Sequence, residues 1–396
     1  MKYDFETLVD RSHSGSYKSR YKELNGIPDH IVPLLGAEFE FPTAPHIMET
    51  LAKKALTGSY AYTGNDQPEY LEAVVRWMAS MRNWKISQEW IVPSCGVLRA
   101  LCTCIRAFSE PGDKIIIQPP VFGAYRKNIL RMDRQILCND LIRDGSSYRI
   151  DFDGLARLMA ENNAKLMVLC NPHNPMGLVW APSDVECMIG LAKENEVIVF
   201  SDEIFADLTN GGRYPTLPAG KAGQATAVTG TSLGKSFGFS GAMHSNIIIA
   251  DPILRERYTA QRNLDYYDGM DPFMYASILA AYTTQSLDWL HAMEAYVEET
   301  VSQVRDFFSA NLPEIKICDR HTAYMLWIDW SAWDMEEERL HAYLHKAGLY
   351  LDKGSDYGEC CGAFTRMVVA APRRCVWEAL ERLIILTKKE PVHEKQ

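Results

Sequence analysis

Continuous apolar runs that alternate with helical segments constrain the fold of this sequence more than any other feature. Residues 165–170 and 196–200 form two such runs, and neither shows the alternation of a half-exposed strand. A strand that is apolar on both sides fits a sheet covered by helices on both faces, and such sheets are parallel. Similar runs at 114–118, 227–230 and 246–249 continue the series. The sequence therefore predicts an α/β layered domain with a mostly parallel sheet and right-handed crossovers.

A change of character near residue 286 indicates a second, smaller domain. The elements expected there are a long helix from about 286 to 311, a strand at 323–328, a helix at 336–347 and an amphipathic helix at 375–388. We predict a large domain at 46–285, and a smaller α+β domain formed by 286–396 together with an N-terminal arm at 1–45.

Composition excludes several kinds of partner. The 396-residue chain has a formal net charge of −10, so a broad surface for nucleic acid or anionic membrane is not expected. No apolar run reaches the roughly 18 residues that span a bilayer. The first residues contain no apolar segment of the kind found in secretory signals. These features predict a cytoplasmic protein that binds neither nucleic acid nor membrane.

The ten cysteines are expected to be reduced core thiols. Cys102 and Cys104 fall in a helical pattern, and Cys170 ends an apolar run. The sequence has no repeated spacing typical of zinc ligands, so no metal site is predicted. Cys360 and Cys361 are adjacent and lie close in sequence to Arg366, so whether they line a substrate pocket stays open.

Three short polar motifs follow three of the predicted strands. They are residues 171–177, 201–204 and 232–235. Ligands bind at the carboxyl ends of strands in open α/β sheets, so the three motifs are expected to meet in one crevice. A lysine amine condenses with aldehydes, a carboxylate can keep a pyridine nitrogen protonated, and an amide can hydrogen-bond a ring oxygen. Lys235, Asp202 and Asn174 therefore predict a site for pyridoxal 5′-phosphate (PLP).

Other residues can complete such a site. Phe122 can stack on a flat ring. Residues 94–98 lead into the helical pattern at 97–108. Backbone N–H groups at a helix N-terminus bind phosphate oxygens, so this segment can hold the phosphate. Ser232, three residues before the lysine, can add a hydroxyl group.

Structural roles are the alternatives for each of these residues. Asn174 can serve an Asn-Pro turn, Asp202 can cap a helix, and Phe122 can be an ordinary core side chain. His173 and His244 fit structural roles better than catalytic ones. The three motifs occurring together favour the cofactor site over these alternatives.

Several longer segments resemble one known family. The chain resembles the cystathionine β-lyase (MalY/PatB-like) branch of the fold-type I PLP-dependent enzymes, in the class I/II aminotransferase superfamily. The resemblance covers nearly the whole length. The segments that carry it are 37–42, 60–63, 110–113, 118–122, 170–175, 352–354, 362–366 and 371–373.

The resemblance implies a role for each cofactor residue. Lys235 would bind the PLP aldehyde and move protons, Asp202 would pair with the pyridine nitrogen, and Asn174 would contact O3′. Phe122 would stack on the ring. The residues expected to hold the phosphate are Gly96, Val97 and Ser232.

The resemblance also implies a substrate site and a partner. Arg366 would bind the α-carboxylate of an amino-acid substrate, with Ala37 also in the substrate site; a guanidinium suits a bidentate contact of this kind. Arg366 in a surface ion pair is the alternative. Tyr62 would reach the phosphate of a neighbouring subunit, which implies a homodimer with shared active sites. Tyr62 as an ordinary interface or core aromatic is the alternative. Lys235, Asp202 and Tyr62 are thus the candidate catalytic residues.

The chain departs from the family pattern at several positions. Phe205 stands where relatives often have a tyrosine or histidine that can donate to O3′. Met243 stands where aminotransferases often carry a phosphate-binding arginine, and its presence favours a lyase. The remaining departures are Gly234 before the lysine, Val368 after the arginine, and the lack of a tryptophan near Leu35.

The resemblance, together with Met243, implies a carbon–sulfur β-lyase. It would act on amino acids of the cystathionine or cysteine S-conjugate type and release pyruvate, ammonia and a thiol. A PLP-dependent aminotransferase uses the same residues and is the nearest alternative. A PLP-binding regulator without useful turnover is the alternative from another class. A dinucleotide-binding enzyme is not expected, because no Gly-x-Gly-x-x-Gly turn follows a strand.

Overall fold

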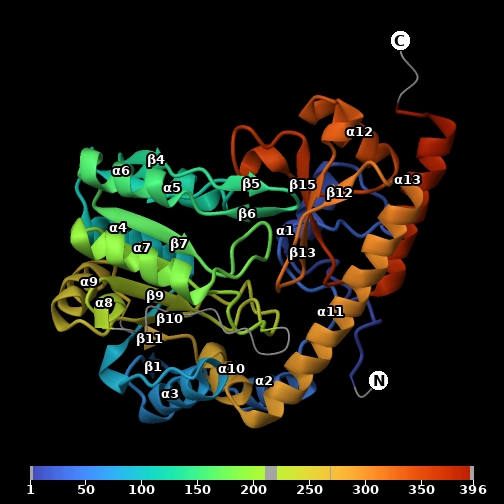
Figure 1. Ribbon diagram of the computed structural model, residues 1–396. Helices are drawn as coiled ribbons and strands as arrows, with labels where there is room; N and C mark the ends of the chain where they lie inside the picture. The colour runs from blue at the N-terminus through green and yellow to red at the C-terminus, as the bar shows by residue number, and fades with distance from the viewer. Residues whose placement is uncertain (1–2, 210–220, 268, 393–396) are drawn as a thin grey trace.

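A seven-stranded sheet forms the centre of the larger part of the molecule (Figure 1). The computed structural model describes residues 3–209, 221–267 and 269–392. In spatial order the strands are β2 (Ile91–Ser94), β10 (Ser245–Ile248), β9 (Ala227–Thr231), β8 (Ile198–Asp202), β7 (Leu166–Cys170), β3 (Lys114–Ile117) and β4 (Gln135–Cys138). The pairs from β9 to β4 are parallel, which confirms the predicted mostly parallel sheet.

Strand β10 is the exception, because it pairs antiparallel with both β9 and β2. The expectation that its run continues a parallel series with crossovers is therefore wrong at this position. A parallel return needs a crossover of a dozen or more residues, usually a helix. The segment 232–244 between β9 and β10 contains no helix and turns directly back. This turn carries Lys235.

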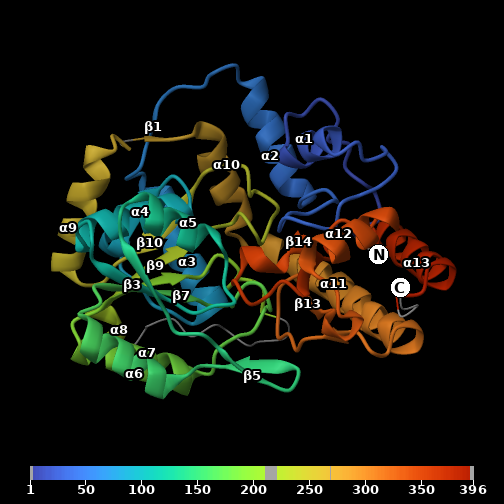
Figure 2. The same ribbon diagram turned by 90° about the horizontal axis from the view of Figure 1, so that it is seen from above.

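Both faces of the sheet are covered, which explains the uninterrupted apolar runs. In β3, Ile115 and Ile117 belong to one hydrophobic cluster and Ile116 to another on the opposite face. In β7, Val168 and Leu169 divide in the same way. Figure 2 shows helices on the two sides of the strands. One side has α4 (Val97–Phe108), α5 (Ala124–Arg131) and α9 (Pro252–Leu264), and the other has α6 (Phe152–Asn162) and α7 (Pro182–Glu194).

A second, antiparallel sheet lies on the right in Figure 1. Its strands in order are β12 (Lys316–Ile317), β13 (Met325–Asp329), β15 (Phe364–Val368) and β14 (Asp352–Lys353). The accompanying helices are α11 (Thr284–Asn311), α12 (Glu337–Lys346) and α13 (Arg373–Lys389). The predicted helices and strand of the C-terminal region are thus confirmed, with ends shifted by a few residues.

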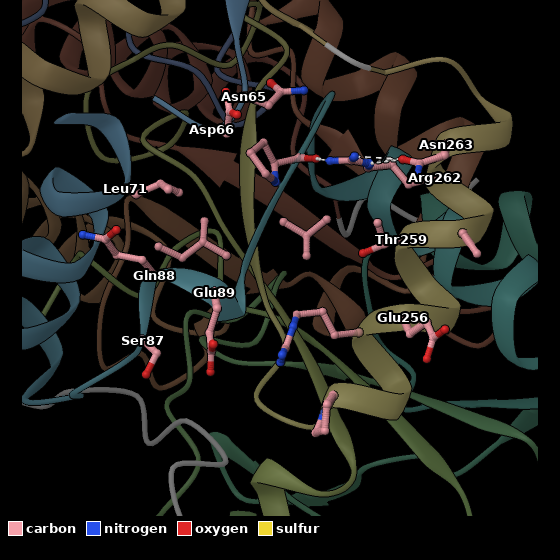
Figure 3. A pocket seen from close by; sticks show the side chains of 16 residues that line it. Asn65, Asp66, Leu71, Ser87, Gln88, Glu89, Glu256, Thr259, Arg262 and Asn263 are labelled. Carbon is pink, nitrogen blue, oxygen red and sulfur yellow. Dashed lines mark hydrogen bonds between the residues drawn. The ribbon is translucent and has the colours of Figure 1, made fainter. Parts of the chain in front are cut away.

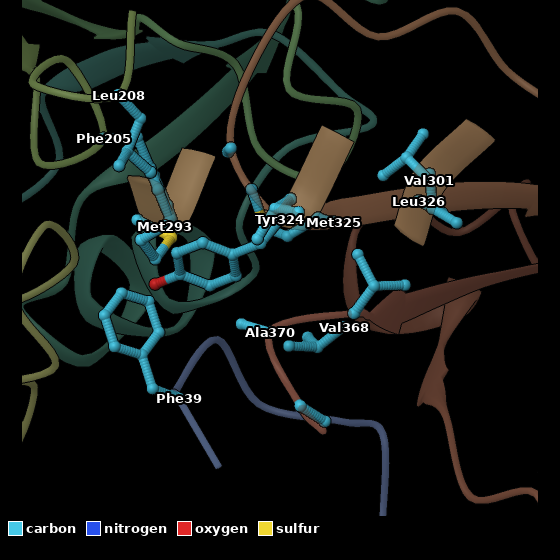
Figure 4. Packing of buried hydrophobic residues seen from close by; sticks show 14 of the residues in the cluster. Phe39, Phe205, Leu208, Met293, Val301, Tyr324, Met325, Leu326, Val368 and Ala370 are labelled. Atoms are coloured by element: carbon cyan, nitrogen blue, oxygen red, sulfur yellow. The ribbon is translucent and has the colours of Figure 1, made fainter. Parts of the chain in front are cut away.

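The N-terminal segment packs against this second sheet. Its backbone is tied there by hydrogen bonds from Val368 N to Leu34 O (2.9 Å) and from Glu40 N to Ala370 O (2.8 Å). Figure 4 shows Phe39 beside the ring of Tyr324, with a centroid distance of 5.2 Å. The arm therefore lies beside the C-terminal elements, while the domain boundaries at 45 and 285 stay a prediction.

The other helices and strands of the described residues complete these two parts. They are α1 (Tyr17–Leu24), α2 (Pro45–Leu56), α3 (Pro68–Arg82), α8 (Lys221–Gln224), α10 (Pro272–Ala281), the strand pairs β1 (Thr63–Gly64) with β11 (Gly269–Met270) and β5 (Ile142–Asp144) with β6 (Ser147–Arg149), and the 3₁₀ turns η1 (Gln88–Trp90), η2 (Ser331–Trp333) and η3 (Gly354–Asp356). Within the described ranges, every helix is too short or too polar to cross a bilayer.

Candidate active site

A cavity of about 500 Å³ opens at the carboxyl ends of β7, β8 and β9, between the two sheets. The N-terminal segment, the central sheet and the second sheet all contribute to its wall. Of the ten residues predicted to form the site, nine line this cavity: Ala37, Gly96, Val97, Phe122, Asn174, Asp202, Ser232, Lys235 and Arg366. The structure therefore brings together side chains that span 330 positions of the sequence, from Ala37 to Arg366.

Lys235 lies in the turn after β9 and is held by two acceptors. Its Nζ donates to the carbonyl oxygen of Ala37 at 2.8 Å and to Oγ of Ser240 at 3.0 Å. Burial, and then the positive charge of Arg366, lower the pKa of Lys235 to about 8. An amine with this pKa is about half unprotonated near pH 8, so Lys235 is suited to act as a nucleophile and a base at mildly alkaline pH.

Asp202 ends β8 as a buried carboxylate with two neutral hydrogen-bond donors. Its Oδ2 accepts from the hydroxyl of Tyr125 at 2.7 Å, and its Oδ1 accepts from the backbone N–H of Ile204 at 3.1 Å. Burial raises the pKa of Asp202, and the Tyr125 hydrogen bond is the strongest influence in the opposite direction. The N-cap alternative for Asp202 finds limited support, because the Ile204 contact closes only a local turn.

Asn174 and Arg366 contact each other in the wall of the cavity. Arg366 Nη1 donates to Oδ1 of Asn174 at 2.9 Å, so the amide oxygen is engaged and the Nδ2 donors remain for another acceptor. Arg366 is 3% exposed and pairs with Asp352, whose Oδ2 accepts from Nη2 at 2.6 Å and from Nε at 3.0 Å. Asp352 also accepts from the backbone N–H of Gly36 at 3.0 Å. Arg366 is thus a buried, fixed guanidinium and not a surface ion-pair residue.

The N-terminus of α4 lies in the wall of the cavity. Gly96 caps the helix with φ of +89°, a conformation that favours glycine, and Val97 begins the first turn. The first N–H groups of a helix have no partner within the helix and attract anions. Ser232 lies in the same wall, where its hydroxyl donates to His244 O at 2.8 Å and accepts from Gly234 N at 3.1 Å. A phosphate contact from Ser232 therefore requires this hydroxyl to rotate.

Three phenylalanine side chains line the cavity, namely Phe122, Phe205 and Phe239. Phe122 lies just before α5 with its ring edge-on to Tyr125, at a centroid distance of 5.6 Å. Phe205 follows β8 and packs against Tyr324, as Figure 4 shows. Phe205 has no hydroxyl and cannot donate to a ring oxygen, whereas the Asn174 amide can.

Tyr62 is the predicted site residue that does not line this cavity. Its side chain is fully exposed, and it borders a separate hollow of about 510 Å³ near β1. The expected contact from a neighbouring subunit stays a prediction. The two adjacent cysteines are also absent from the cavity wall: Cys360 is exposed, and Cys361 is buried in a hydrophobic cluster.

A charged cluster lies buried behind Asp202 and Lys235. Arg82, at the end of α3, donates to Glu203 Oε2 at 2.9 Å and to Asp207 Oδ1 at 2.7 Å. Ser236 Oγ, next to Lys235, also donates to Asp207 at 3.1 Å. The cluster connects α3 to the residues that follow both Asp202 and Lys235.

A larger hollow of about 1160 Å³ lies elsewhere, beside the edge strand β2 and helix α9 (Figure 3). Its lining is rich in charged and amide side chains such as Glu89, Glu256 and Arg262. None of the ten predicted site residues borders it. Size alone therefore does not identify the site, and the chemistry of the lining residues favours the smaller cavity.

A family model matches this chain over residues 30–383, and the family is described as aminotransferase class I and II. The chain belongs to this family. Cystathionine beta-lyase PatB of Bacillus subtilis (strain 168) is 32% identical over 384 residues, which cover 96% of this chain and 98% of the relative. Protein MalY of Escherichia coli (strain K12) is 26% identical over 385 residues, with coverage of 96% and 98%.

A solved structure agrees over the same length. Cystalysin from Treponema denticola, whose crystal structure contains a pyridoxal 5′-phosphate cofactor, matches with a TM-score of 0.93 and 32% identity. The match covers 98% of this chain and 100% of cystalysin. The family match confirms the predicted family, and the match to cystalysin confirms the predicted fold.

Three residues of the site were missed from the sequence. Tyr125 lies in the first turn of α5, and nothing in its local sequence indicates its contact with Asp202. Ser240 and Asp352 act through hydrogen bonds to Lys235 and Arg366, and nothing in their local sequence indicates those contacts.

Proposed function

We propose that this protein binds PLP and catalyses β-elimination of a thiol from a sulfur-bearing amino acid. The observation that carries the proposal is the meeting of Lys235, Asp202, Asn174 and Arg366 in one cavity. Full-length similarity to PatB, MalY and cystalysin supports the lyase reading over other reactions of the family.

The residues of the cavity fit the chemical groups of PLP. The Lys235 amine suits the aldehyde, the Asp202 carboxylate suits a protonated pyridine nitrogen, and the free Nδ2 donors of Asn174 suit the ring oxygen. The helix N-terminus at Gly96 suits the phosphate. Phe122 provides an apolar surface for the ring.

Separate residues of the chain bind the substrate and remove its proton. PLP, when bound, supplies an electron sink for the charge that develops on the substrate Cα. Arg366 binds the α-carboxylate of the substrate, and Asp352 keeps the guanidinium in place. Lys235 Nζ, with its pKa of about 8, removes the proton from Cα.

The overall reaction balances with water as the co-reactant. The Cα–H and Cβ–S bonds break, and the thiol leaves with the sulfur. Addition of one water molecule to the remaining three-carbon unit releases ammonia and pyruvate. Neither a reductant nor an oxidant is required.

Tyr62 supports a second part of the proposal, which is a dimer with shared sites. A fully exposed tyrosine next to β1 is available to a second copy of the chain. We propose that the Tyr62 side chain completes the phosphate site of that copy. Tyr62→Phe mixed with Lys235→Ala protein tests this, because subunit exchange should restore one intact site in the hybrid dimer.

Pyruvate release tests the main proposal. Purified protein loaded with PLP is incubated with cystathionine and with S-alkyl cysteines, and pyruvate is measured in a coupled assay. We expect pyruvate with wild-type protein and none with Lys235→Ala. Turnover of an amino acid plus 2-oxoglutarate without pyruvate would instead establish the aminotransferase, and absence of both reactions would refute an enzymatic role on these substrates.

A further inference from the structure

Tyr125 is a buried tyrosine in the wall of the cavity. It lies in the first turn of α5, is 1% exposed, and lines the same cavity as Asp202. Its hydroxyl donates to Asp202 Oδ2 at 2.7 Å, although the two residues are 77 positions apart in the sequence. Sequence reasoning gave this residue no role.

The direction of this hydrogen bond follows from the groups around it. Burial raises the pKa of Tyr125 well above its ordinary value, so the hydroxyl keeps its proton and must be the donor. The carboxylate of Asp202 is the acceptor, and its other oxygen accepts from the Ile204 backbone. Both donors are neutral, so they favour the ionised carboxylate without cancelling its charge.

The charge of Asp202 decides whether the carboxylate can serve a ring nitrogen. Burial alone drives Asp202 towards the neutral acid, which cannot hold a pyridine nitrogen in its protonated form. The Tyr125 hydrogen bond opposes this effect more than the Ile204 bond or the nearby Lys235 does. Hydrogen bonds to charged groups are also stronger than those between neutral groups.

We propose that Tyr125 is a positioning residue that holds the Asp202 carboxylate ionised and directed towards the ring nitrogen of the cofactor. This inference rests on the PLP-binding part of the proposed function and not on the elimination reaction. The start of α5 would then contribute to the cofactor site twice, through the Phe122 ring just before the helix and through the Tyr125 hydroxyl in its first turn.

A purely structural role for Tyr125 makes a different prediction. Tyr125 also packs in the hydrophobic cluster of α4, α5 and α9, so its loss can disturb the cavity in general. A general disturbance weakens any ligand of the same shape. A role through the Asp202 charge weakens only ligands that carry a ring nitrogen.

PLP and one analogue of it separate these roles. Cofactor-free Tyr125→Phe protein is titrated with PLP and with an analogue in which a CH group replaces the ring nitrogen, and dissociation constants are read from the change in protein fluorescence. We expect the PLP constant to rise about tenfold to a hundredfold, the range given by a hydrogen bond to a charged group. The constant for the analogue should not rise.

Tyr258→Phe is the matched control. Tyr258 is a buried tyrosine of the same cluster and does not border the cavity, so its substitution should leave both constants unchanged. Equal weakening of both ligands by Tyr125→Phe, or no weakening of either, would overturn the inference. Failure of wild-type protein to bind PLP would overturn both this inference and the proposed function. PLP binding without pyruvate release would refute only the elimination reaction, and the two dissociation constants would still decide the role of Tyr125.

Discussion

Removal of Arg82 should destabilise the fold more than any other single loss of charge considered in this protein. Arg82 is shared by two buried carboxylates: Nη1 donates to Glu203 at 2.9 Å, and Nη2 and Nε donate to Asp207 at 2.7 and 3.1 Å. The three side chains are 1%, 0% and 2% exposed. Arg82→Ala therefore leaves the carboxyl groups of Asp207 and Glu203 buried without their cation.

The cost follows from the chemistry of buried charges. Removing one partner of a buried ion pair costs about 3–5 kcal/mol, because the other charge stays buried and uncompensated. Neutral donors remain after the substitution, since Trp77 and Ser236 still donate to Asp207. We therefore expect Arg82→Ala to lower the free energy of unfolding by about 3–5 kcal/mol and not by more.

The pH dependence of the loss has a defined sign. Burial raises the pKa of Glu203 from 4.5 to about 8, even with Arg82 beside it. The folded protein therefore holds this proton over a pH range in which the unfolded chain has released it, and the contribution of Glu203 to stability falls as pH rises from 4.5 to about 8. Without Arg82 this pKa rises further, so the variant should lose more stability at alkaline pH than at mildly acidic pH.

Urea unfolding of cofactor-free protein at fixed protein concentration measures these effects, because bound ligand would otherwise add to stability. Arg76→Ala is the matched control: Arg76 lies on the same helix in an exposed pair with Glu72 at 3.5 Å, and its loss should cost at most about 0.5 kcal/mol. An Arg82→Ala loss no larger than the Arg76→Ala loss would refute the reasoning.

Three further predictions concern the cavity and its surroundings. Asp352→Asn should raise KM for amino-acid substrates about tenfold, with a smaller change in kcat, because Arg366 loses a charged partner; steady-state kinetics decides this. The rate at which cofactor-free protein captures PLP should rise with pH around a midpoint of about 8, because only the unprotonated Lys235 amine attacks; a midpoint at the ordinary 10.5 in stopped-flow traces would contradict this. Gly123→Ala should lower the free energy of unfolding by about 1–3 kcal/mol in the same urea assay, because the added Cβ would lie 1.9 Å from a backbone oxygen of η3. Gly190→Ala in α7 is the control: its Cβ meets no neighbour within 4 Å, so this substitution should raise the free energy of unfolding by about 0.5–1 kcal/mol.

The sheet was predictable because burial on two faces leaves a direct mark on the sequence. Ile115, Ile116 and Ile117 are all apolar since their side chains alternate between two covered faces. The direction of β10 leaves no such mark. Its apolar run is equally compatible with either direction, and the outcome depends on the short connection that carries Lys235.

The candidate site divides in a similar way. Asn174, Asp202 and Lys235 were predictable because each follows a buried strand, and strand ends meet at one edge of a sheet. Tyr125 and Asp352 were not, because their importance comes from partners 77 and 14 positions away and from their orientation in the folded chain. A single sequence contains motifs but not the pairings between them.

The N-terminal segment links Arg366, the proposed substrate-binding residue, to Lys235, the proposed base. Ala37 O accepts from Lys235, and the neighbouring Gly36 N–H donates to Asp352, which in turn holds Arg366. The positive charge of Arg366 helps to lower the pKa of Lys235. A substrate carboxylate bound to Arg366 would offset that charge and raise the proton affinity of Lys235. The same contact that positions the substrate would therefore strengthen the base at the moment when a Cα proton has to be removed.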